Sequence, residues 1–534
     1  LGLVWAQLAA VPKTTMGPRG SMKQNWKHAL VRRRLFVSIL ILLQAGFLFY
    51  LIGSTSATSE LLRGLLTIIS IGTVLHIISK QGDPNAKLTW VFLILLVPIV
   101  GGLLYLLYSL QSGTNFVRKL LARRRDILRP LFYLPNAESG MSSPASVGKY
   151  GPLLKYMHGT CGYPAYDNTQ SEYLSPGQVF FSRLLVELEK AEKYIFLEFF
   201  IIEEGKMWNS VLEILERKAK EGLDVRVMYD DVGCFLTLPS NYHKTLESKG
   251  IRCRKFHPFQ PFLTSLQNQR DHRKILVIDG KVAFTGGANL ADEYINAYEK
   301  HGYWQDAALC VKGKGAWSFT LMFLQLWDYW EDLDPSTVRS LYPGDQAASH
   351  ICAQGIVQPY ADSPMDQELT GHSAYLRIIQ SAQDYVYIAT PYLIIDDILM
   401  RALTLAAKSG VDVRIITPCI PDKPPVHQTT RSYYPELIEA GVRIYEFTPG
   451  FMHAKVSVSD DVIASVGSVN MDYRSLYLHF ECGCLLYDCP CIQDIKADYL
   501  DILQKCHLIR LEECKGGFFH RLIQEVLRLF APLL

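Results

Sequence analysis

The distribution of apolar residues divides the chain into an N-terminal apolar region and a longer region with the alternation typical of a globular domain. Three apolar stretches lie near the N-terminus: Leu35–Ile52, Leu61–Ile78 and Leu88–Tyr108. A helix needs about 20 predominantly apolar residues to cross a bilayer. The first and third stretches carry no charged residue, whereas the second contains Arg63 and His76. We therefore predict transmembrane segments within residues 35–110.

Basic residues stand on both sides of this apolar region. Arg32–Arg34 precede the first stretch, and a second group, Arg118, Lys119 and Arg123–Arg125, follows the third. Because positive residues prefer the cytoplasm, two positive ends require an even number of crossings. Three candidates therefore imply that one segment is interfacial or re-entrant, or that one flank breaks the rule. We expect a multi-pass protein of the cell membrane with a cytoplasmic catalytic region.

The segments that flank these stretches complete the N-terminal organisation. Residues 1–34 form an extension, and residues 1–21 lack the basic start of a secretory signal, so we interpret them as non-native sequence. Residues 111–165 form a basic linker. The C-terminal segment, residues 516–534, contains FFHRLIQEVLRLFAPLL, which either lies on a lipid surface or packs as a terminal helix.

From residue 166 the pattern repeats. AEKYIFLEFFII is followed by a helical run and AKEGLDVRVMYDD, and the later AQDYVYIATPYLII is followed by AAKSGVDVRIITP. Strands that alternate with amphipathic helices predict an α/β fold with a largely parallel sheet. A repeat of about 180 residues indicates a duplicated domain. The predicted halves are residues 166–345 and 346–515.

Each half contains the same spaced motif. The first reads HRKILVIDGKVAFTGGAN and the second HAKVSVSDDVIASVGSVN. In both, Lys follows His by two positions, Asp by seven and Asn by seventeen. A single His-x-Lys occurs often by chance, but two copies with the same four residues at the same three offsets are a strong signal. The matched residues are His272, Lys274, Asp279 and Asn289, and His453, Lys455, Asp460 and Asn470.

The motif spacing separates its members into two groups. Side chains two positions apart on a strand share a face, so each His projects together with its Lys. Asp279 and Asp460 stand at an odd offset and are followed by turn residues. We therefore expect these aspartates to hold turns or nearby basic groups without touching the reacting atom.

The residues after the motif are candidates for binding phosphate. Glycine lets the backbone approach a phosphate, and Ser468, Asn289 and Asn470 can donate hydrogen bonds to it. Two lysines and two asparagines around one phosphodiester would stabilise the added charge of its transition state. This chemistry requires no metal and no cofactor.

Two histidines suit a covalent mechanism. One attacks phosphorus, while the other protonates the leaving alkoxide and later deprotonates the incoming alcohol. Asp306 and Glu481, one after each motif, are candidate orienting carboxylates; otherwise they are charged residues at strand ends. The remaining histidines near these segments are interpreted as ordinary surface or core residues: His257, His301, His427 and His479.

The composition bears on two kinds of partner, nucleic acids and metal ions. The net charge of +2 gives no reason to expect a nucleic-acid partner. Four of the twelve cysteines form a C-x-C-x4-C-x-C cluster, Cys482–Cys491, with no matching His or Cys pair at zinc-site spacing. Reduced thiols on a strand and turn are favoured over a metal site.

The paired motifs resemble the two HKD motifs of the phospholipase D superfamily. Residues Pro449–Glu481 are similar to the second motif region of bacterial cardiolipin synthases, as are LEFFII, RSYYPELIEAGVRIYEF, the apolar segments Leu61–Tyr108 and the terminal FAPLL. The resemblance covers residues 60–534. The chain departs from the pattern at Gly287, where serine often follows the first glycine, and in its extra apolar stretch Leu35–Ile52.

The resemblance implies two similar α/β halves packed face to face around one site at their pseudo-two-fold interface. It implies that two phosphatidylglycerols, held in the bilayer, give cardiolipin and glycerol. By analogy, His272 is the nucleophile and His453 the acid and base. Four alternatives remain: a hydrolytic phospholipase D, another phosphatidyltransferase of the superfamily, a nuclease of the superfamily, and a degenerate membrane scaffold without activity.

Overall fold

The structure is a computed structural model that divides into two compact units. It describes residues 57–80, 82–96, 112–134, 144–258, 268–327, 334–344, 353–366 and 368–533, with residues 46, 101, 102, 105, 109 and 331. Unit 1 is Leu1–Phe116, Phe259–Asn268 and Arg528–Leu534, and unit 2 is Val117–Pro258 and Gln269–Leu527. Unit 2 contains both motifs.

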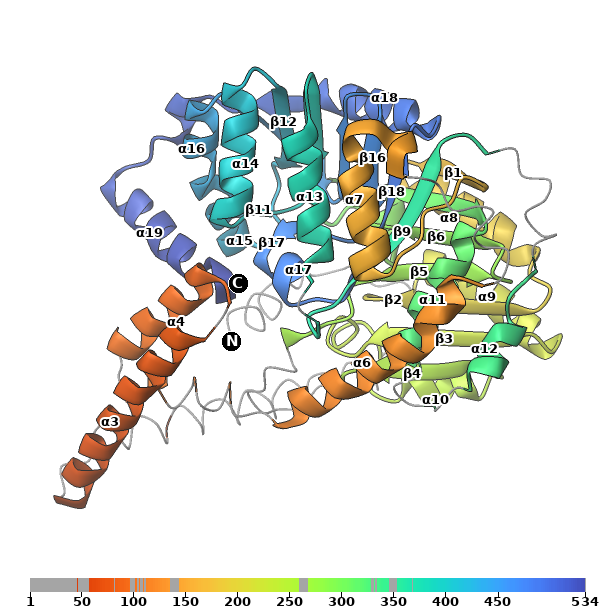
Figure 1. The fold of residues 1–534 in the computed structure, drawn as a ribbon, viewed down its shortest axis with the longest axis horizontal. Helices are drawn as coiled ribbons and strands as arrows, with labels where there is room; N and C mark the ends of the chain where they lie inside the picture. The colour runs from red at the N-terminus through yellow and green to blue at the C-terminus, as the bar shows by residue number, and fades with distance from the viewer. Residues whose placement is uncertain are drawn as a thin grey trace, which may run out of the picture. The chain divides into compact units, whose positions relative to one another are not determined.

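Unit 1 is built on two apolar helices, α3 (Ala57–Ser79) and α4 (Pro84–Leu96) (Figure 1). Ile77 of α3 and Ile94 of α4 are buried together with Tyr105, while most of their other large apolar side chains are exposed. In the part of the chain that the structure describes, no helix is long and apolar enough to cross a membrane.

The three apolar stretches that were predicted to cross the membrane lie within the described residues to different extents. The second lies within α3, and the third begins in α4 but includes residues 97–100, which lie outside the described residues. The first stretch, apart from residue 46, also lies outside them.

Unit 2 contains two large mixed sheets. The first has the order β1-β8-β6-β5-β2-β3-β4. Its strands are β1 (Thr169–Leu174), β2 (Tyr194–Phe199), β3 (Asp224–Asp230), β4 (Arg252–Phe256), β5 (Lys274–Ile278), β6 (Val282–Gly286) and β8 (Ala308–Gly313). The second has the order β19-β13-β12-β10-β15-β16-β18-β9. Its strands are β9 (Ile356–Asp362), β10 (Tyr385–Ala389), β12 (Asp412–Pro418), β13 (Arg443–Phe447), β15 (Val456–Ser459), β16 (Ile463–Gly467), β18 (Glu481–Tyr487) and β19 (Cys506–Leu508).

The helices include six longer ones in the two halves of unit 2. These are α8 (Gly177–Glu189), α9 (Lys206–Lys220), α11 (Gly315–Trp327), α13 (Thr370–Ser381), α14 (Asp397–Lys408) and α18 (Cys491–Leu503). Shorter ones are α7 (Gly151–Tyr156), α10 (Tyr242–Glu247), α12 (Pro335–Ser340), α15 (Pro424–Ser432), α16 (Tyr434–Glu439) and α17 (Tyr473–Tyr477). α6 (Ser112–Phe132) begins in unit 1, and α19 (Phe518–Leu529) ends there.

The predicted α/β fold of two similar halves is present, but the prediction of a largely parallel sheet is wrong. Only β2-β3-β4 and β10-β12-β13 pair in parallel, and every other neighbour in the two sheets pairs antiparallel. The reason lies in the motifs themselves. Each forms a hairpin, β5–β6 or β15–β16, and a tight turn returns a strand antiparallel.

The repeated βαβ segment forms as its pattern predicts. All six residues of β2 are buried, as expected for a central strand covered on both faces. α9 buries one stripe at helical spacing: Met207, Trp208, Val211, Ile214 and Leu215. Gly222 and Gly410 follow α9 and α14 with φ of 95° and 96°, which glycine adopts without steric cost. In the second half, α13 and α14 lie side by side (Figure 1).

The two sheets are joined by the buried apolar helix α11 and by contacts between their own strands. α11, sequence GAWSFTLMFLQLW, is apolar on all sides, and all but one of its residues are buried. It contacts β5 and β8 of the first sheet and β9 of the second. β6 and β8 also contact β16, so the motif hairpins of the two halves meet at this interface.

The motif aspartates secure the turns, as expected. Asp279 and Asp460 have φ of 54° and 53° in the hairpin turns. The Asp279 carboxylate accepts the backbone N–H groups of residues 192, 193 and 194 at 2.8–2.9 Å, and Asp460 accepts those of 383, 384 and 385 at 2.9–3.0 Å. Each aspartate therefore ties the end of the motif strand to the start of the neighbouring central strand.

Substitutions of Asp460 and of its neighbour Asp461 test this structural role. We expect Asp460→Asn to lower the free energy of unfolding by about 2 kcal/mol, because one amide oxygen replaces a carboxylate that accepts three backbone N–H groups. The control is Asp461→Asn, since Asp461 shares the turn but is 44% exposed and pairs with Lys496; its cost should stay below about 1 kcal/mol. Chemical denaturation measures both. Loss of turnover in folded Asp460→Asn protein would instead place this aspartate in the chemistry.

Candidate active site

Both His-Lys pairs lie buried at the ends of their motif strands. His272 and His453 are less than one-tenth exposed, and Lys274 and Lys455 are almost completely buried. The ammonium groups of the two lysines donate to the backbone carbonyls of His272 (2.6 Å) and His453. Burial, and after it the positive charges of Lys274, Lys455 and His453, lower the pKa of His272.

Directly before each histidine, a short segment of one half pairs with a segment of the other half. β14 (Gly450–Met452) pairs in parallel with β7 (Tyr303–Gln305), and the His453 N–H donates to the Gln305 carbonyl at 2.8 Å. In the same way, Asp271 bridges to Phe480, and the His272 N–H donates to the Phe480 carbonyl at 2.9 Å. Each histidine therefore lies beside the carboxylate that follows the other half's motif.

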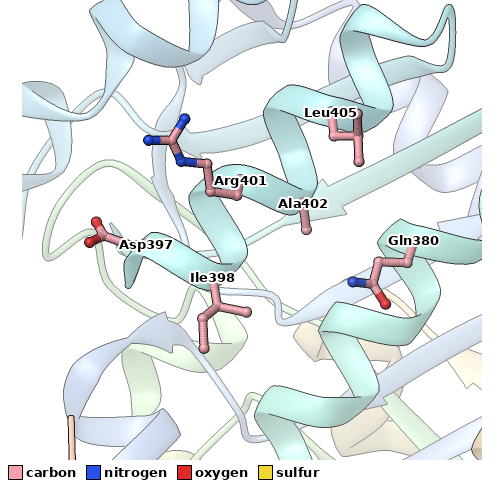
Figure 2. A pocket seen from close by; sticks show the side chains of 6 residues that line it. All are labelled: Gln380, Asp397, Ile398, Arg401, Ala402 and Leu405. Atoms are coloured by element: carbon pink, nitrogen blue, oxygen red, sulfur yellow. The ribbon is translucent and has the colours of Figure 1, made fainter. Parts of the chain in front are cut away.

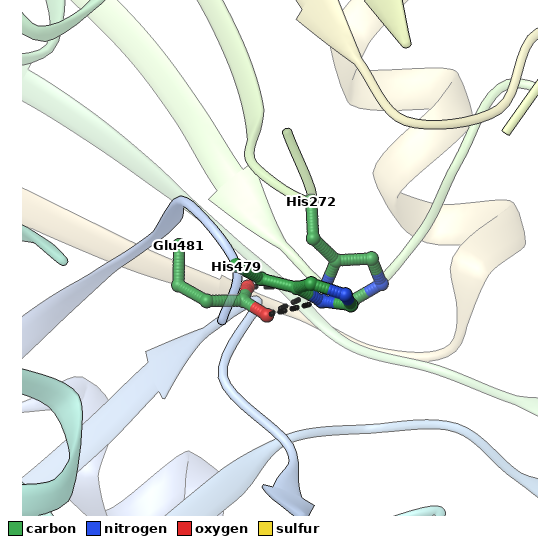
Figure 3. A group of neighbouring side chains, drawn as sticks. All are labelled: His272, His479 and Glu481. Atoms are coloured by element: carbon green, nitrogen blue, oxygen red, sulfur yellow. Dashed lines mark hydrogen bonds and ion pairs between the residues drawn. The ribbon is translucent and has the colours of Figure 1, made fainter. Parts of the chain in front are cut away.

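The two candidate carboxylates orient the histidines crosswise. His272 Nδ1 lies 3.0 Å from both carboxylate oxygens of Glu481, as Figure 3 shows, and His453 Nδ1 lies 2.6 Å from Asp306 Oδ2. Both carboxylates are fully buried. Because each carboxylate accepts a hydrogen bond from Nδ1–H, the proton of the neutral ring stays on Nδ1 and Nε2 keeps its lone pair. The arrangement therefore presents two Nε2 atoms for reaction.

Burial favours the neutral form of both histidines. It lowers the pKa of His272 well below its ordinary value, and Lys274 and Lys455 add to the effect. Burial and Lys455 lower the pKa of His453 to about 4, although Asp306 opposes them. Burial also lowers the pKa of Lys274 to about 8 and that of Lys455 to about 7. A bound phosphodiester anion would favour the charged forms of all four groups.

Two of the three predicted phosphate ligands have other partners. Ser468 is fully buried, and its hydroxyl donates to Glu481, so its prediction as a phosphate ligand is replaced by contact with the orienting carboxylate. The Asn289 amide accepts the Ile201 N–H at 3.0 Å and donates to the Tyr294 hydroxyl at 2.7 Å, which leaves it one hydrogen. These side chains brace the site.

Asn470 is different, because its buried amide oxygen has no hydrogen-bond partner among the described residues. The oxygen and nitrogen of an amide are exchanged by a half-turn of the side chain. A half-turn would present its NH₂ group to an anion at this position; its role as a phosphate donor stays a prediction.

The surroundings of Gly287 explain why the first motif has glycine where serine often follows the first glycine. It occupies the position that corresponds to Ser468, and a Cβ there would lie 2.2 Å from Asp306 Oδ1 and 3.0 Å from the His453 carbonyl oxygen. Asp306 thus fills the space of a side chain at 287. The missing hydroxyl removes a hydrogen bond to the orienting carboxylate, the one that Ser468 makes to Glu481 in the second motif.

His479 is a site residue that sequence reasoning treated as ordinary. Its ring lies 5.6 Å from that of His272, and its Nδ1 lies 3.7 Å from Glu481 Oε1 (Figure 3). Trp304 holds the corresponding place in the first half, 5.2 Å from the ring of His453. Both residues stand two positions before a carboxylate, and this shared offset is the signal that could have identified them.

A group of three side chains and a surface depression have the form of ligand sites. In the described part of the chain, His272, His479 and Glu481 are the group whose donor atoms could hold a metal ion, lying within 4.8 Å of one another. Glu481 already accepts from His272 and Ser468, so the group is engaged without an ion. A depression of about 410 Å³ between α13 and α14 includes Asp397 and Arg401 (Figure 2), but no motif residue lines it.

Comparison with known proteins identifies similar chains over most of the sequence. A family model described as cardiolipin synthase, PLD-like domain, matches residues 184–303 and 375–502, and one described as phospholipase D-nuclease N-terminal matches residues 68–108. The chain is 45% identical to an uncharacterized protein of Streptococcus mutans over 87% of this chain and all of that one. It is 35% identical to a cardiolipin synthase of Geobacillus sp. WCH70 over 94% of this chain and all of the relative.

A solved structure shares the fold at low sequence identity. The crystal structure of phosphatidylserine synthase from Haemophilus influenzae Rd KW20 superposes with a TM-score of 0.52 at 18% identity. The match covers 68% of this chain and 93% of that one.

Proposed function

Because the chain belongs to the cardiolipin synthases, phosphatidyltransferases of the phospholipase D type, we propose that its crossed His-Lys site joins two phosphatidylglycerols into cardiolipin and glycerol. One observation carries the mechanism. Each buried histidine has its Nδ1 on a carboxylate of the other half, which directs both Nε2 atoms to reaction. The two lysines beside them supply positive charge without a metal.

The first step forms a covalent intermediate. His272 Nε2 attacks the phosphorus of one phosphatidylglycerol, and the bond from phosphorus to the headgroup glycerol oxygen breaks. His453, protonated at Nε2, gives its proton to that oxygen, and glycerol leaves. Lys274, Lys455 and Asn470 stabilise the charge that develops on the phosphoryl oxygens.

The second step transfers the phosphatidyl group. A hydroxyl of the second phosphatidylglycerol loses its proton to His453 Nε2, and its oxygen attacks the phosphorus. The bond between phosphorus and His272 Nε2 breaks, which releases cardiolipin and restores both histidines. Water at the acceptor position would give phosphatidic acid instead.

The unequal carboxylates support this division of roles. Glu481 is shared between His272 and Ser468, whereas Asp306 has no hydroxyl partner at Gly287 and holds His453 at 2.6 Å. A carboxylate that no side-chain hydroxyl shares stabilises an imidazolium better, which suits the residue that must carry a proton. Burial lowers the pKa of His272 well below its ordinary value, which suits a neutral nucleophile.

The N-terminal region supports action at a membrane. The substrates are bilayer lipids, and residues 68–108 match the model described as phospholipase D-nuclease N-terminal. The proposal includes anchoring of this region in the cell membrane, with the catalytic unit on the cytoplasmic side.

A change at Asp306 tests the role of His453. Asp306 raises the pKa of His453, so Asp306→Asn should lower that pKa further and reduce the protonated fraction at any pH above it. The alkaline limb of the profile of kcat/KM against pH should therefore move to lower pH, with an activity loss of about 10²-fold or more. Glu481→Gln serves as the comparison, because its effect falls on His272. If Glu481→Gln alone moved the alkaline limb, the roles would be reversed.

A product assay with defined headgroups tests the reaction. Purified protein in mixed micelles should convert phosphatidylglycerol to cardiolipin with release of one glycerol. An active preparation that made phosphatidic acid from phosphatidylglycerol or phosphatidylcholine, and no cardiolipin, would show a hydrolytic phospholipase D instead.

A further inference from the structure

The C-terminal helix α19 carries an apolar stripe that nothing in the described structure covers. Its exposed large apolar residues are Phe518, Phe519, Leu522, Ile523 and Val526, which are 47–77% exposed. They recur at helical spacing and so share one face, while Arg521, Gln524 and Glu525 lie on the other. Five exposed apolar side chains on one helix exceed what scattered surface residues explain.

The end of this helix joins the apolar unit of the protein. The Thr89 hydroxyl of α4 donates to the Leu529 carbonyl at 2.7 Å, and the ring of Phe530 meets that of Phe92 edge-on at 6.1 Å. Ala531 and Pro532 in η8 (Ala531–Leu533) are buried. α4 itself exposes Leu88, Leu95 and Leu96 among its large apolar side chains. The C-terminus is thus built into the unit whose described helices α3 and α4 expose large apolar side chains.

We infer that α19 lies in the lipid–water interface of an anionic bilayer, with the stripe from Phe518 to Val526 among the acyl chains and Arg521 at the headgroups. This inference rests on the proposed function, because a phosphatidyltransferase must meet its substrates at such a surface. The composition fits: aromatic and branched side chains stand on one face and charged ones on the other, as in helices that lie in the interface plane. At twelve residues, α19 is too short to span a bilayer.

Photocrosslinking identifies what covers the stripe. The full-length protein, with p-benzoylphenylalanine at Ile523, is reconstituted in vesicles of phosphatidylglycerol and phosphatidylethanolamine and irradiated. We expect lipid adducts by mass spectrometry. The matched control places the same group at Glu525, on the polar face, where lipid adducts should be at least about fivefold fewer. Crosslinks from position 523 to a second copy of the chain, or to the rest of the same chain, would overturn the inference.

A charge placed on either face gives a functional test. Ile523→Glu should raise the bulk lipid concentration needed for half-maximal transfer on vesicles by about tenfold, since one apolar side chain no longer partitions. The control Gln524→Glu adds the same charge on the polar face and should change this value less than twofold. Equal effects of the two substitutions, or no effect of either, would contradict docking. Lipid adducts from a protein that makes no cardiolipin would retain docking while the proposed function fails.

Discussion

Alanine at His272 is expected to abolish all turnover, whereas alanine at His453 should still allow one round of leaving-group release from an activated substrate. Each substitution should lower cardiolipin synthesis by at least about 10⁴-fold. With a phosphatidyl ester of p-nitrophenol, however, the leaving group needs no proton from His453. The His453→Ala protein should then release one nitrophenolate per site and stop, because no base remains to activate the acceptor.

The contrast between the variants separates nucleophile from acid and base. His272→Ala should show no burst, since the atom that attacks phosphorus is missing. His507→Ala is the control, because His507 is exposed on β19 and pairs with Glu513, away from both motifs. A burst from His272→Ala and none from His453→Ala would exchange the two roles. Equal steady turnover by both variants would exclude a phosphohistidine.

Removing either buried lysine is expected to have the second largest effect. Lys455→Met or Lys274→Met should reduce kcat by about 10³-fold, since each ammonium group faces the charge that develops on phosphorus and methionine keeps the volume. The substitutions should also shift the pH profile. Lys274 lowers the pKa of both Lys455 and His453, so Lys274→Met should raise both pKa values and move the alkaline limb of kcat/KM to higher pH.

The direction of this shift distinguishes an electrostatic role from structural damage. Lys496→Met is the control, since Lys496 lies at the surface with Asp461 and its loss should leave both rate and profile unchanged. A fall in kcat for Lys274→Met without an upward shift of the alkaline limb would contradict the proposed coupling of the two lysines.

The local features of the fold could be predicted from the sequence. The βαβ repeat, the left-handed glycines after α9 and α14 and the motif turns depend on residues close in the chain, and the structure has them as their patterns predict. The mixed sheets were missed, although the short Asp279-Gly280 turn already implied an antiparallel hairpin.

The site required tertiary information that no local pattern contains. Asp306 and Glu481 were predicted as orienting carboxylates. That each of them orients the histidine of the other half depends on the pairing of β14 with β7 and of Asp271 with Phe480. The same pairing brings the His272 ring to Glu481 and His479, and the pairing of β16 with β18 sets Ser468 beside Glu481. Side chains that act on another side chain, not on the ligand, leave no distinct motif in one sequence.

The most direct test of the mechanism is to identify the residue that carries the phosphatidyl group. The protein is mixed with phosphatidylglycerol, quenched in alkali within milliseconds, digested and analysed by mass spectrometry. The proposed mechanism predicts a phosphatidyl adduct on the peptide that contains His272, at higher occupancy in the His453→Ala protein with the activated ester. An adduct on His453, or cardiolipin formation with no histidine adduct at any time, would contradict it.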